Sequence, residues 1–204
     1  MTDMTKPSFT VTPNDVVCMS DADWLKLVAE LAYPDRAPTM VKAVELAKER
    51  AVKRIVETGC IRGWAGDGQS TLIWAMLSVR LGCAFETFEL SGVHLKKAKE
   101  WLDSFSAFTS WHLGDSVSGL SASSNRFDFA YLDSFDYDAA NPRPCQLHQL
   151  AEVGAIYGKL TENAIVMMDD ANLDGGGKVA MAVDFLKGNG WKEIASGYQI
   201  ILSR

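Results

Sequence analysis

Short apolar runs alternate with segments of helical periodicity along most of this chain, and this alternation restricts its fold more than any other feature. The apolar runs cover residues 52–58, 84–90, 109–113, 127–132, 164–168, 191–195 and 198–202. The helical segments between them cover residues 70–81, 92–105, 146–157 and 179–186. Apolar strands separated by helices are typical of a parallel sheet covered on both faces. We therefore predict an α/β fold, a three-layer α/β/α sandwich around a mostly parallel, seven-stranded sheet.

The last two apolar runs are separated by Ser196 and Gly197 alone. So short a connection leaves no room for a crossover helix, and the two strands must form a hairpin with a tight turn. The sheet is therefore predicted to close with an antiparallel C-terminal hairpin. Gly82 directly follows the helical segment 70–81, at the position where a glycine commonly ends a helix.

Two helices are predicted before the first strand. Asp21 can cap the first helix, Pro34 follows its end, and the second helix covers residues 39–50. The chain has 204 residues, which is within the size range of one domain. We predict a single domain over residues 1–204, made of an N-terminal helical cap region at 1–51 and a sheet core at 52–204.

Charge and composition exclude several classes of partner. The formal net charge is −6 and no stretch gathers Lys and Arg on one face, which argues against a nucleic-acid partner. Residues 1–12 lack the basic start and apolar run of a signal peptide, and no later stretch is long and apolar enough to span a bilayer. The four cysteines include no C-x-x-C pair, which favours reduced thiols over a zinc site. We expect a cytoplasmic protein that binds neither membrane nor nucleic acid.

The loop after the first predicted strand is rich in glycine. In a doubly wound sheet the ligand binds at this turn, and glycines let backbone N–H groups approach it closely. Ile61 breaks the dinucleotide pattern G-x-G-x-x-G, and Gln69 replaces the lysine of a P-loop. S-adenosylmethionine (SAM) carries a sulfonium cation and an amino group, so an acidic residue such as Glu57 beside the loop suits it. NAD and nucleoside triphosphates are therefore disfavoured relative to SAM.

The segments 56–59 (Val-Glu-Thr-Gly) and 70–72 (Ser-Thr-Leu) resemble the first motif of class I SAM-dependent methyltransferases, although the loop between them is longer than usual. The resemblance implies a Rossmann-like fold with SAM as cofactor. It places the following residues around SAM: Glu57, Gly59, Gly63, Gly66, Gly68, Ser70 and Thr71.

Two further positions are candidate cofactor contacts. Glu89 ends the second strand, where a carboxylate can accept hydrogen bonds from both ribose hydroxyls, as it also would in an NAD-binding fold. Asp115 and Ser116 follow the third strand, where this family contacts the adenine. A simple turn or helix cap is the alternative role for this pair.

Acidic residues follow the fourth and fifth predicted strands. Asp133 comes directly after one, and Asp169 and Asp170 end the other, so neighbouring parallel strands would bring the three carboxylates to one edge of the sheet. Three hard oxygen ligands point to Mg²⁺ or Ca²⁺, although acidic residues also occur at strand ends as turn formers or caps. The segments 131–133 and 165–170 resemble the metal-binding strand ends of metal-dependent catechol-type and macrocin-type O-methyltransferases. This resemblance implies Asp133, Asp169 and Asp170 as metal ligands, with Asp133 also beside the cofactor.

The base that removes a proton from the acceptor stays open. Catechol-type enzymes have a lysine three residues after the first metal aspartate, whereas this chain has Asp136 there. Asp133, Asp136 and His148 are the catalytic candidates.

We expect SAM-dependent O-methylation of a small-molecule acceptor, assisted by a divalent cation. The alternatives are a metal-independent SAM methyltransferase acting on another atom, and a nucleotide- or SAM-binding module without turnover. The N-terminal helices lie where related enzymes form a substrate lid or a homodimer contact.

Overall fold

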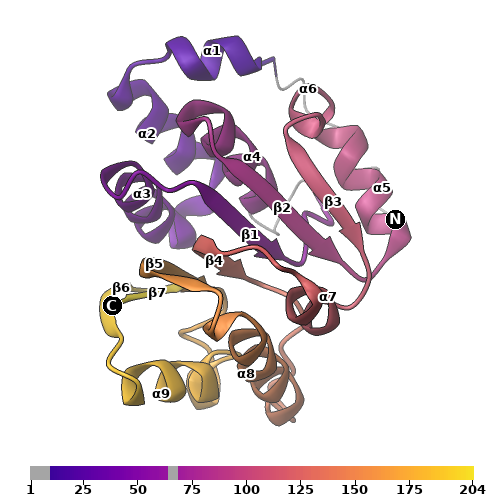
Figure 1. The fold of residues 1–204 in the computed structure, drawn as a ribbon, viewed down its shortest axis with the longest axis vertical. Coiled ribbons are helices and arrows are strands. Elements are labelled where there is room, and N and C mark those ends of the chain that lie inside the picture. The colour runs from indigo at the N-terminus through magenta and orange to yellow at the C-terminus, as the bar shows by residue number, and fades with distance from the viewer. Residues whose placement is uncertain (1–9, 64–68) are drawn as a thin grey trace.

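The computed structural model describes residues 10–63 and 69–204, so the predicted contacts of Gly66 and Gly68 lie outside the described residues. The central feature is one seven-stranded sheet with the strand order β3-β2-β1-β4-β5-β7-β6 (Figure 1). The strands are β1 (Arg54–Thr58), β2 (Ala84–Glu89), β3 (Thr109–Leu113), β4 (Phe127–Leu132), β5 (Leu160–Met168), β6 (Lys192–Ser196) and β7 (Ile200–Ser203). The first five pair in parallel, and β7 pairs antiparallel with both β5 and β6. The predicted mixed sheet with its closing hairpin is confirmed.

Helices cover both faces of the sheet. One layer holds α1 (Pro13–Cys18), α2 (Asp21–Leu31), α3 (Tyr33–Glu49), α4 (Ser70–Leu81), α5 (Gly92–Trp101) and α6 (Asp103–Ser106). The other holds α7 (Ser116–Ala122), α8 (Arg143–Tyr157) and α9 (Ala180–Gly188), with a short 3-10 helix at Asp174–Gly176 before α9. The predicted three-layer sandwich is therefore present.

The central strands β1, β4 and β5 are buried along most of their length because each face of the sheet meets a helix layer, whereas the edge strand β6 is mostly exposed. Ile55 and Ile165 pack in the core under α3 and α4, whereas their neighbours Val56 and Val166 pack in the core under α8 and α9. Successive strand residues point to opposite faces, so a strand covered on both faces favours apolar residues at successive positions.

Two predicted helix starts are corrected. Ser20 caps α2, since its hydroxyl oxygen accepts the backbone N–H of Asp23 at 3.2 Å, and Asp21 is the first helical residue instead. The helix predicted from residue 39 begins at Tyr33, with Pro34 in its first turn. Proline is tolerated there because the first N–H groups of a helix have no partner within the helix.

Other departures involve segments with weak apolar patterns. The strands β6 and β7 are joined by the three residues 197–199 rather than by Ser196 and Gly197 alone. The helix α7 was not predicted, because its serine- and glycine-rich sequence lacks an apolar stripe. The predicted helix 92–105 is divided into α5 and α6 near Leu102.

The helix α3 is part of the sandwich itself. Met40, Ala43, Val44 and Ala47 are buried in the core cluster on the sheet. The N-terminal end of α3 therefore has a fixed place relative to the sheet, which brings Arg36 to the edge where β4 and β5 end. A lid role for the N-terminal region stays a prediction.

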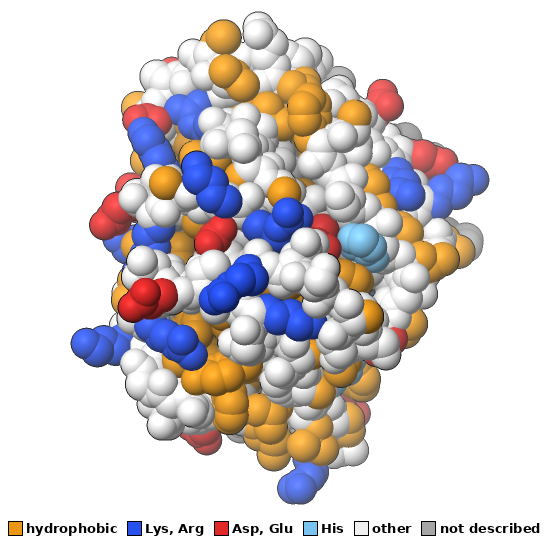
Figure 2. Space-filling view, viewed as in Figure 1, with side chains coloured by type: hydrophobic (Ala, Val, Ile, Leu, Met, Phe, Trp, Pro, Cys, Tyr) orange, Lys and Arg blue, Asp and Glu red, His pale blue; other side chains and the backbone are white. Residues whose placement is uncertain are grey.

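The described surface carries mixed charges. On the face drawn in Figure 2, basic side chains lie among acidic and uncharged ones. No helix among the described residues is long and apolar enough to cross a membrane.

Candidate functional site

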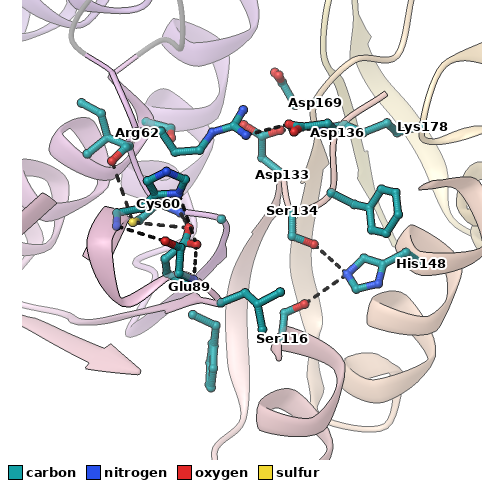
Figure 3. A pocket seen from close by; sticks show the side chains of 18 of the residues that line it. Cys60, Arg62, Glu89, Ser116, Asp133, Ser134, Asp136, His148, Asp169 and Lys178 are labelled. Atoms are coloured by element: carbon teal, nitrogen blue, oxygen red, sulfur yellow. Dashed lines mark hydrogen bonds and ion pairs between the residues drawn. The ribbon is translucent and has the colours of Figure 1, made fainter. Parts of the chain in front are cut away.

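A cavity of about 490 Å³ lies at the carboxyl ends of the parallel strands, where doubly wound sheets bind their ligands (Figure 3). The β1–α4 loop and the ends of β2, β4 and β5 surround it. Among the predicted site residues, its lining contains Gly59, Ser70, Glu89, Asp115, Ser116, Asp133, Asp136, His148, Asp169 and Asp170. The structure therefore brings most of the predicted residues into one space.

Gly59 allows the first loop to pass close to the end of β4. Its φ is +76°, and a Cβ at this position would lie 2.7 Å from the backbone oxygen of Asp133. Both the backbone conformation and the close approach require glycine. The β1–α4 loop is thereby held against Asp133, at the centre of the cavity.

Glu57 and Thr71 are buried beneath the loop and are not among the described cavity-lining residues. The carboxylate of Glu57 accepts hydrogen bonds from Ser70 Oγ at 2.9 Å and Thr87 Oγ1 at 2.8 Å. Thr71 Oγ1 accepts the backbone N–H of Ile61 at 2.9 Å. Burial raises the pKa of Glu57 to about 8, which favours the neutral carboxyl at pH 7. In this arrangement Glu57 and Thr71 anchor the loop.

Glu89 lines the cavity, and backbone N–H groups hold both of its carboxylate oxygens. Its Oε2 accepts the backbone N–H of Cys60 at 3.2 Å, and its Oε1 accepts that of Ser91 at 2.7 Å. His94 Nδ1 lies 3.7 Å from Oε1. A carboxylate fixed at a strand end in this way can accept hydrogen bonds from a ribose.

Asp115 caps α7, and it also lines the cavity. Its Oδ2 accepts the backbone N–H of Ser118 at 2.8 Å. Gly63, also predicted from the loop, is buried.

Ser116 and His148 belong to a hydrogen-bonded group that the sequence analysis did not predict. Ser116 Oγ and Ser134 Oγ each donate to Glu152 Oε1 at 2.5 Å. His148 Nε2 lies 2.8 Å from Ser134 Oγ and 3.4 Å from Glu152 Oε1. The hydrogen bond with Glu152 raises the pKa of His148. The spacing of His148 and Glu152, four residues apart on a helix, is the signal that could have indicated this pair.

Asp136 lies on the exposed rim of the cavity. Arg62 Nη1 donates to its Oδ1 at 2.7 Å, and both side chains are largely exposed. Its position favours a contact at the cavity entrance over one at the reacting atoms.

Asp133, Asp169 and Asp170 come together as predicted. Each offers a carboxylate oxygen, and these three atoms lie within 4.8 Å of one another. The parallel pairing of Leu132 with Met168 explains this, because it places the residues that follow β4 and β5 side by side. Burial and the charge of Asp169 raise the pKa of Asp133 above its ordinary value.

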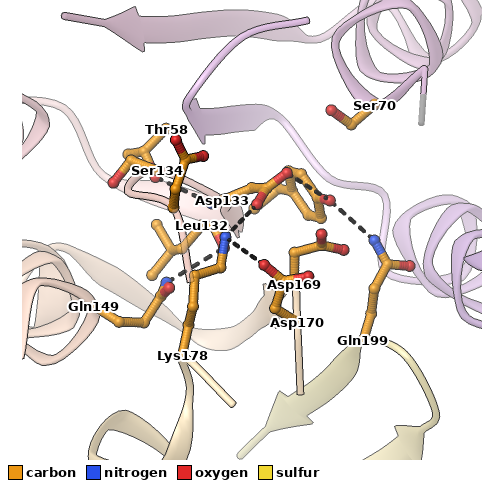
Figure 4. Close-up of polar contacts among 12 residues, drawn as sticks. Thr58, Ser70, Leu132, Asp133, Ser134, Gln149, Asp169, Asp170, Lys178 and Gln199 are labelled. Atoms are coloured by element: carbon orange, nitrogen blue, oxygen red, sulfur yellow. Dashed lines mark hydrogen bonds and ion pairs between the residues drawn. The ribbon is translucent and has the colours of Figure 1, made fainter. Parts of the chain in front are cut away.

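Two cationic side chains already pair with these carboxylates, and Figure 4 shows the one from Lys178. Lys178 Nζ lies 2.7 Å from Asp133 Oδ1 and 3.0 Å from Asp170 Oδ2. Arg36 uses Nε and Nη2 to donate to the two oxygens of Asp169, at 3.1 and 2.8 Å. The side chain of Lys178 is only 3% exposed. Each aspartate therefore has a cationic partner within the chain.

Neither Lys178 nor Arg36 was predicted from the sequence as a site residue. Lys178 follows three consecutive glycines, which could have indicated a tight backbone approach at this point. Arg36 comes from a helix far from the sheet ends in sequence, and no motif indicated it.

The cluster as folded does not fit the expected Mg²⁺ or Ca²⁺. Carboxylate oxygens are suitable ligands for Mg²⁺, which binds them at about 2.0–2.1 Å. The buried ammonium of Lys178 donates a hydrogen bond to Asp133 and forms an ion pair with Asp170, so a divalent ion among the carboxylates would meet a like charge at close range. The ion would have to displace Lys178 before it could bind there.

No protein-family model matches the chain, and no curated protein matches it. Its structure is similar to that of SAH-bound Podospora anserina methyltransferase, with a TM-score of 0.59, 16% identity, and 91% of this chain and 88% of that chain covered. It is also similar to an O-methyltransferase from Bacillus cereus in complex with SAH, with a TM-score of 0.58, 17% identity and 94% of each chain covered. An N-methyltransferase from Bradyrhizobium japonicum gives a TM-score of 0.54 at 14% identity, covering 84% of this chain and 95% of that chain. The strand order and these similarities show that the chain has the Rossmann-like fold of SAM-dependent methyltransferases.

Proposed function

We propose that this chain transfers the methyl group of SAM to an oxygen atom of a small molecule. The observation that carries the proposal is the composition of one cavity. Its lining includes Glu89 and Asp115, which suit the cofactor, together with Asp133 and its charged neighbours, which suit the acceptor. Two similar solved structures contain SAH, which is SAM after loss of the methyl group. The fold and the cavity thus support the same chemistry.

The cofactor would lie along the carboxyl ends of β1 and β2. Glu89 would accept hydrogen bonds from the ribose hydroxyls, and Asp115 with Ser116 would contact the adenine. The loop at Gly59 would pass beneath the methionine part, where the absence of a side chain leaves room. This arrangement directs the methyl group toward Asp133, because Gly59 lies directly against it.

Asp133 is the proposed base. It lines the cavity, and Lys178 fixes one of its carboxylate oxygens, whereas Asp136 pairs with Arg62 at the rim and His148 faces two serines. The proton of the acceptor hydroxyl would pass to Asp133. The acceptor oxygen would then bond to the methyl carbon as the carbon–sulfur bond breaks, and the bonding pair would stay on sulfur. Alignment supplies most of the catalysis, since SAM already carries an activated methyl group.

The divalent cation expected from the sequence is not part of this proposal, because Lys178 and Arg36 already pair with the three aspartates. This observation favours methyl transfer without a metal ion, whichever atom accepts the methyl group. The acceptor atom is inferred from the O-methyltransferase resemblance, and one similar structure is an N-methyltransferase. Product analysis with hydroxyl and amine acceptors would show whether the chain methylates oxygen or nitrogen.

A small molecule suits the site better than a nucleic acid. The net charge of −6 repels a phosphate backbone, and the cavity of about 490 Å³ is within the range of small-molecule sites.

Isothermal titration with SAM, and with ATP and NAD as controls, tests the cofactor. We expect selective SAM binding that Glu89→Ala weakens by about tenfold or more, because a hydrogen-bonded carboxylate is lost. Glu30→Ala, which removes an exposed carboxylate on α2, is the matched control and should bind SAM normally. Binding of ATP or NAD without SAM would refute the proposal. SAM binding without transfer to any hydroxyl acceptor would favour a module without turnover.

A further inference from the structure

The carboxylate cluster holds a cation that belongs to the chain. The Lys178 ammonium is buried, and it bridges Asp133 and Asp170, which approach it from the ends of two neighbouring strands (Figure 4). The two carboxylates offset the charge of this buried ammonium.

The backbone before Lys178 is built to deliver this side chain. Gly177 has φ +61°, and a Cβ there would lie 1.7 Å from the backbone oxygen of Asp170. That oxygen accepts the backbone N–H of Lys178 at 3.2 Å. Asp170 itself has a left-handed φ of 54°, which is uncommon for a residue with a side chain. The segment 170–178 therefore folds back on itself at some conformational cost and brings Lys178 beside the carboxylates.

The helix α8 also holds the segment 170–178 in position. Gln146 on α8 is buried, and its Nε2 donates to the backbone oxygens of Gly175 and Gly177 at 3.2 and 2.9 Å. The position of Lys178 is thus fixed by the glycine segment and by a helix of the core. A surface lysine that happened to lie near an acidic group would have no such support.

Arg36 completes the charge balance. Its guanidinium pairs with both oxygens of Asp169 and lies 4.1 Å from the centre of the Tyr198 ring. Tyr198 also forms a hydrogen bond with Asp170. Two fixed cations thus stand against three carboxylates, which leaves the cluster with one net negative charge instead of the three that would attract a divalent ion.

We infer that Lys178 is the resident cation of this site and takes the place that a divalent metal would hold. An ammonium has three N–H donors; one donates to Asp133 Oδ1 at 2.7 Å, and the ammonium also pairs with Asp170 Oδ2 at 3.0 Å. No third acceptor for it is present among residues 10–63 and 69–204, and Lys178 lines the cavity. The remaining donor is available to an acceptor oxygen. This last step rests on the proposed function: Lys178 would bind the oxygen of a hydroxylated small molecule and stabilise its negative charge as Asp133 removes the proton.

Titration with Mn²⁺, followed by its paramagnetic resonance signal, tests the inference without reference to activity. Wild-type protein should bind no Mn²⁺ at the cluster, whereas Lys178→Met should bind one ion, because three carboxylates then lose a cationic partner. Adding Asp133→Asn to Lys178→Met should abolish that binding. Lys187→Met is the matched control, since Lys187 is an exposed lysine of α9 that pairs with Glu193, and it should behave as wild type.

Stoichiometric Mn²⁺ binding by the wild type that Asp133→Asn removes would overturn the inference, as would a folded Lys178→Met protein that binds no Mn²⁺. Circular dichroism establishes folding, and Lys178→Gln is the second variant because it retains a polar side chain. If neither variant folds, the wild-type titration decides alone: absence of Mn²⁺ binding supports the inference and binding overturns it.

Methyl transfer separates this inference from the proposed function. Lys178→Met should lower turnover at saturating SAM by about tenfold or more while the SAM dissociation constant changes by less than about twofold. Failure of the wild type to bind SAM would refute the proposed function, but the Mn²⁺ result would still decide whether Lys178 replaces a metal.

Discussion

The ammonium of Lys178 lies 2.7 Å from Oδ1 of Asp133, although the two residues are 45 positions apart in the chain. Asp133 directly follows β4 at the middle of the sheet, whereas Lys178 comes from the segment before α9. This pair changes the chemistry of the carboxylate cluster, because Lys178 and Arg36 already offset two of its three negative charges in the folded chain.

The ion pair between Arg36 and Asp169 is expected to stabilise the fold. Asp169→Asn leaves a largely buried guanidinium without its carboxylate, and breaking one side of such a pair costs about 3–5 kcal/mol of unfolding free energy. Urea denaturation of Asp169→Asn, Arg36→Met and the double variant measures the coupling. The double variant should be less destabilised than the sum of the two single changes. Additive losses would mean that the two side chains do not interact in solution.

Gly177 should tolerate no side chain, whereas its neighbour Gly175 should tolerate one better. Both have a positive φ, but a Cβ at Gly177 would lie 1.7 Å from the Asp170 backbone oxygen and a Cβ at Gly175 would meet only Pro142 Cγ at 4.0 Å. Gly175→Ala should therefore cost about 1–2 kcal/mol for the left-handed backbone alone, and Gly177→Ala should cost clearly more. Chemical denaturation of the two variants checks this. Equal losses would show that the segment relaxes away from Asp170.

Glu57 should make the stability of the protein fall as the pH rises. Burial raises its pKa in the folded chain from 4.5 to about 8, so the folded state keeps a proton that the unfolded state releases. Stability is unaffected by this group below the unfolded pKa of 4.5 and declines between there and about 8. Glu57→Gln keeps a neutral group of similar shape and should remove this decline.

The measurement for Glu57 is the unfolding free energy at several pH values across that window. As the pH rises, the unfolding free energy of Glu57→Gln should increase relative to that of the wild type, by a few kcal/mol in total. Glu30→Gln, at an exposed carboxylate, is the control and should follow the wild-type profile. Parallel profiles for Glu57→Gln and wild type would show that Glu57 is ionised in the folded protein.

The residues predicted from strand ends were found together because their position follows from local rules. Glu89 and Asp133 each come at the end of an apolar run, and parallel strands bring their carboxyl ends to one edge. Gly59 was predicted from the loop composition, and its positive φ agrees with that reading. For Glu57, however, the residue type predicted a charge facing the ligand, whereas burial and two hydroxyl partners place it beneath the loop.

The sequence by itself determined the fold class, because apolar runs without alternation require a sheet covered on both faces, and it indicated the aspartates whose place is set by the strands that carry them. Only the tertiary structure decided the charge state and partners of those aspartates. Arg36 and Lys178 reach them from distant elements through the packing of α3 on the sheet and the close approach of Gly177 to Asp170. Such contacts depend on how layers pack and on where a backbone turns, and no periodicity or motif within the chain specifies them.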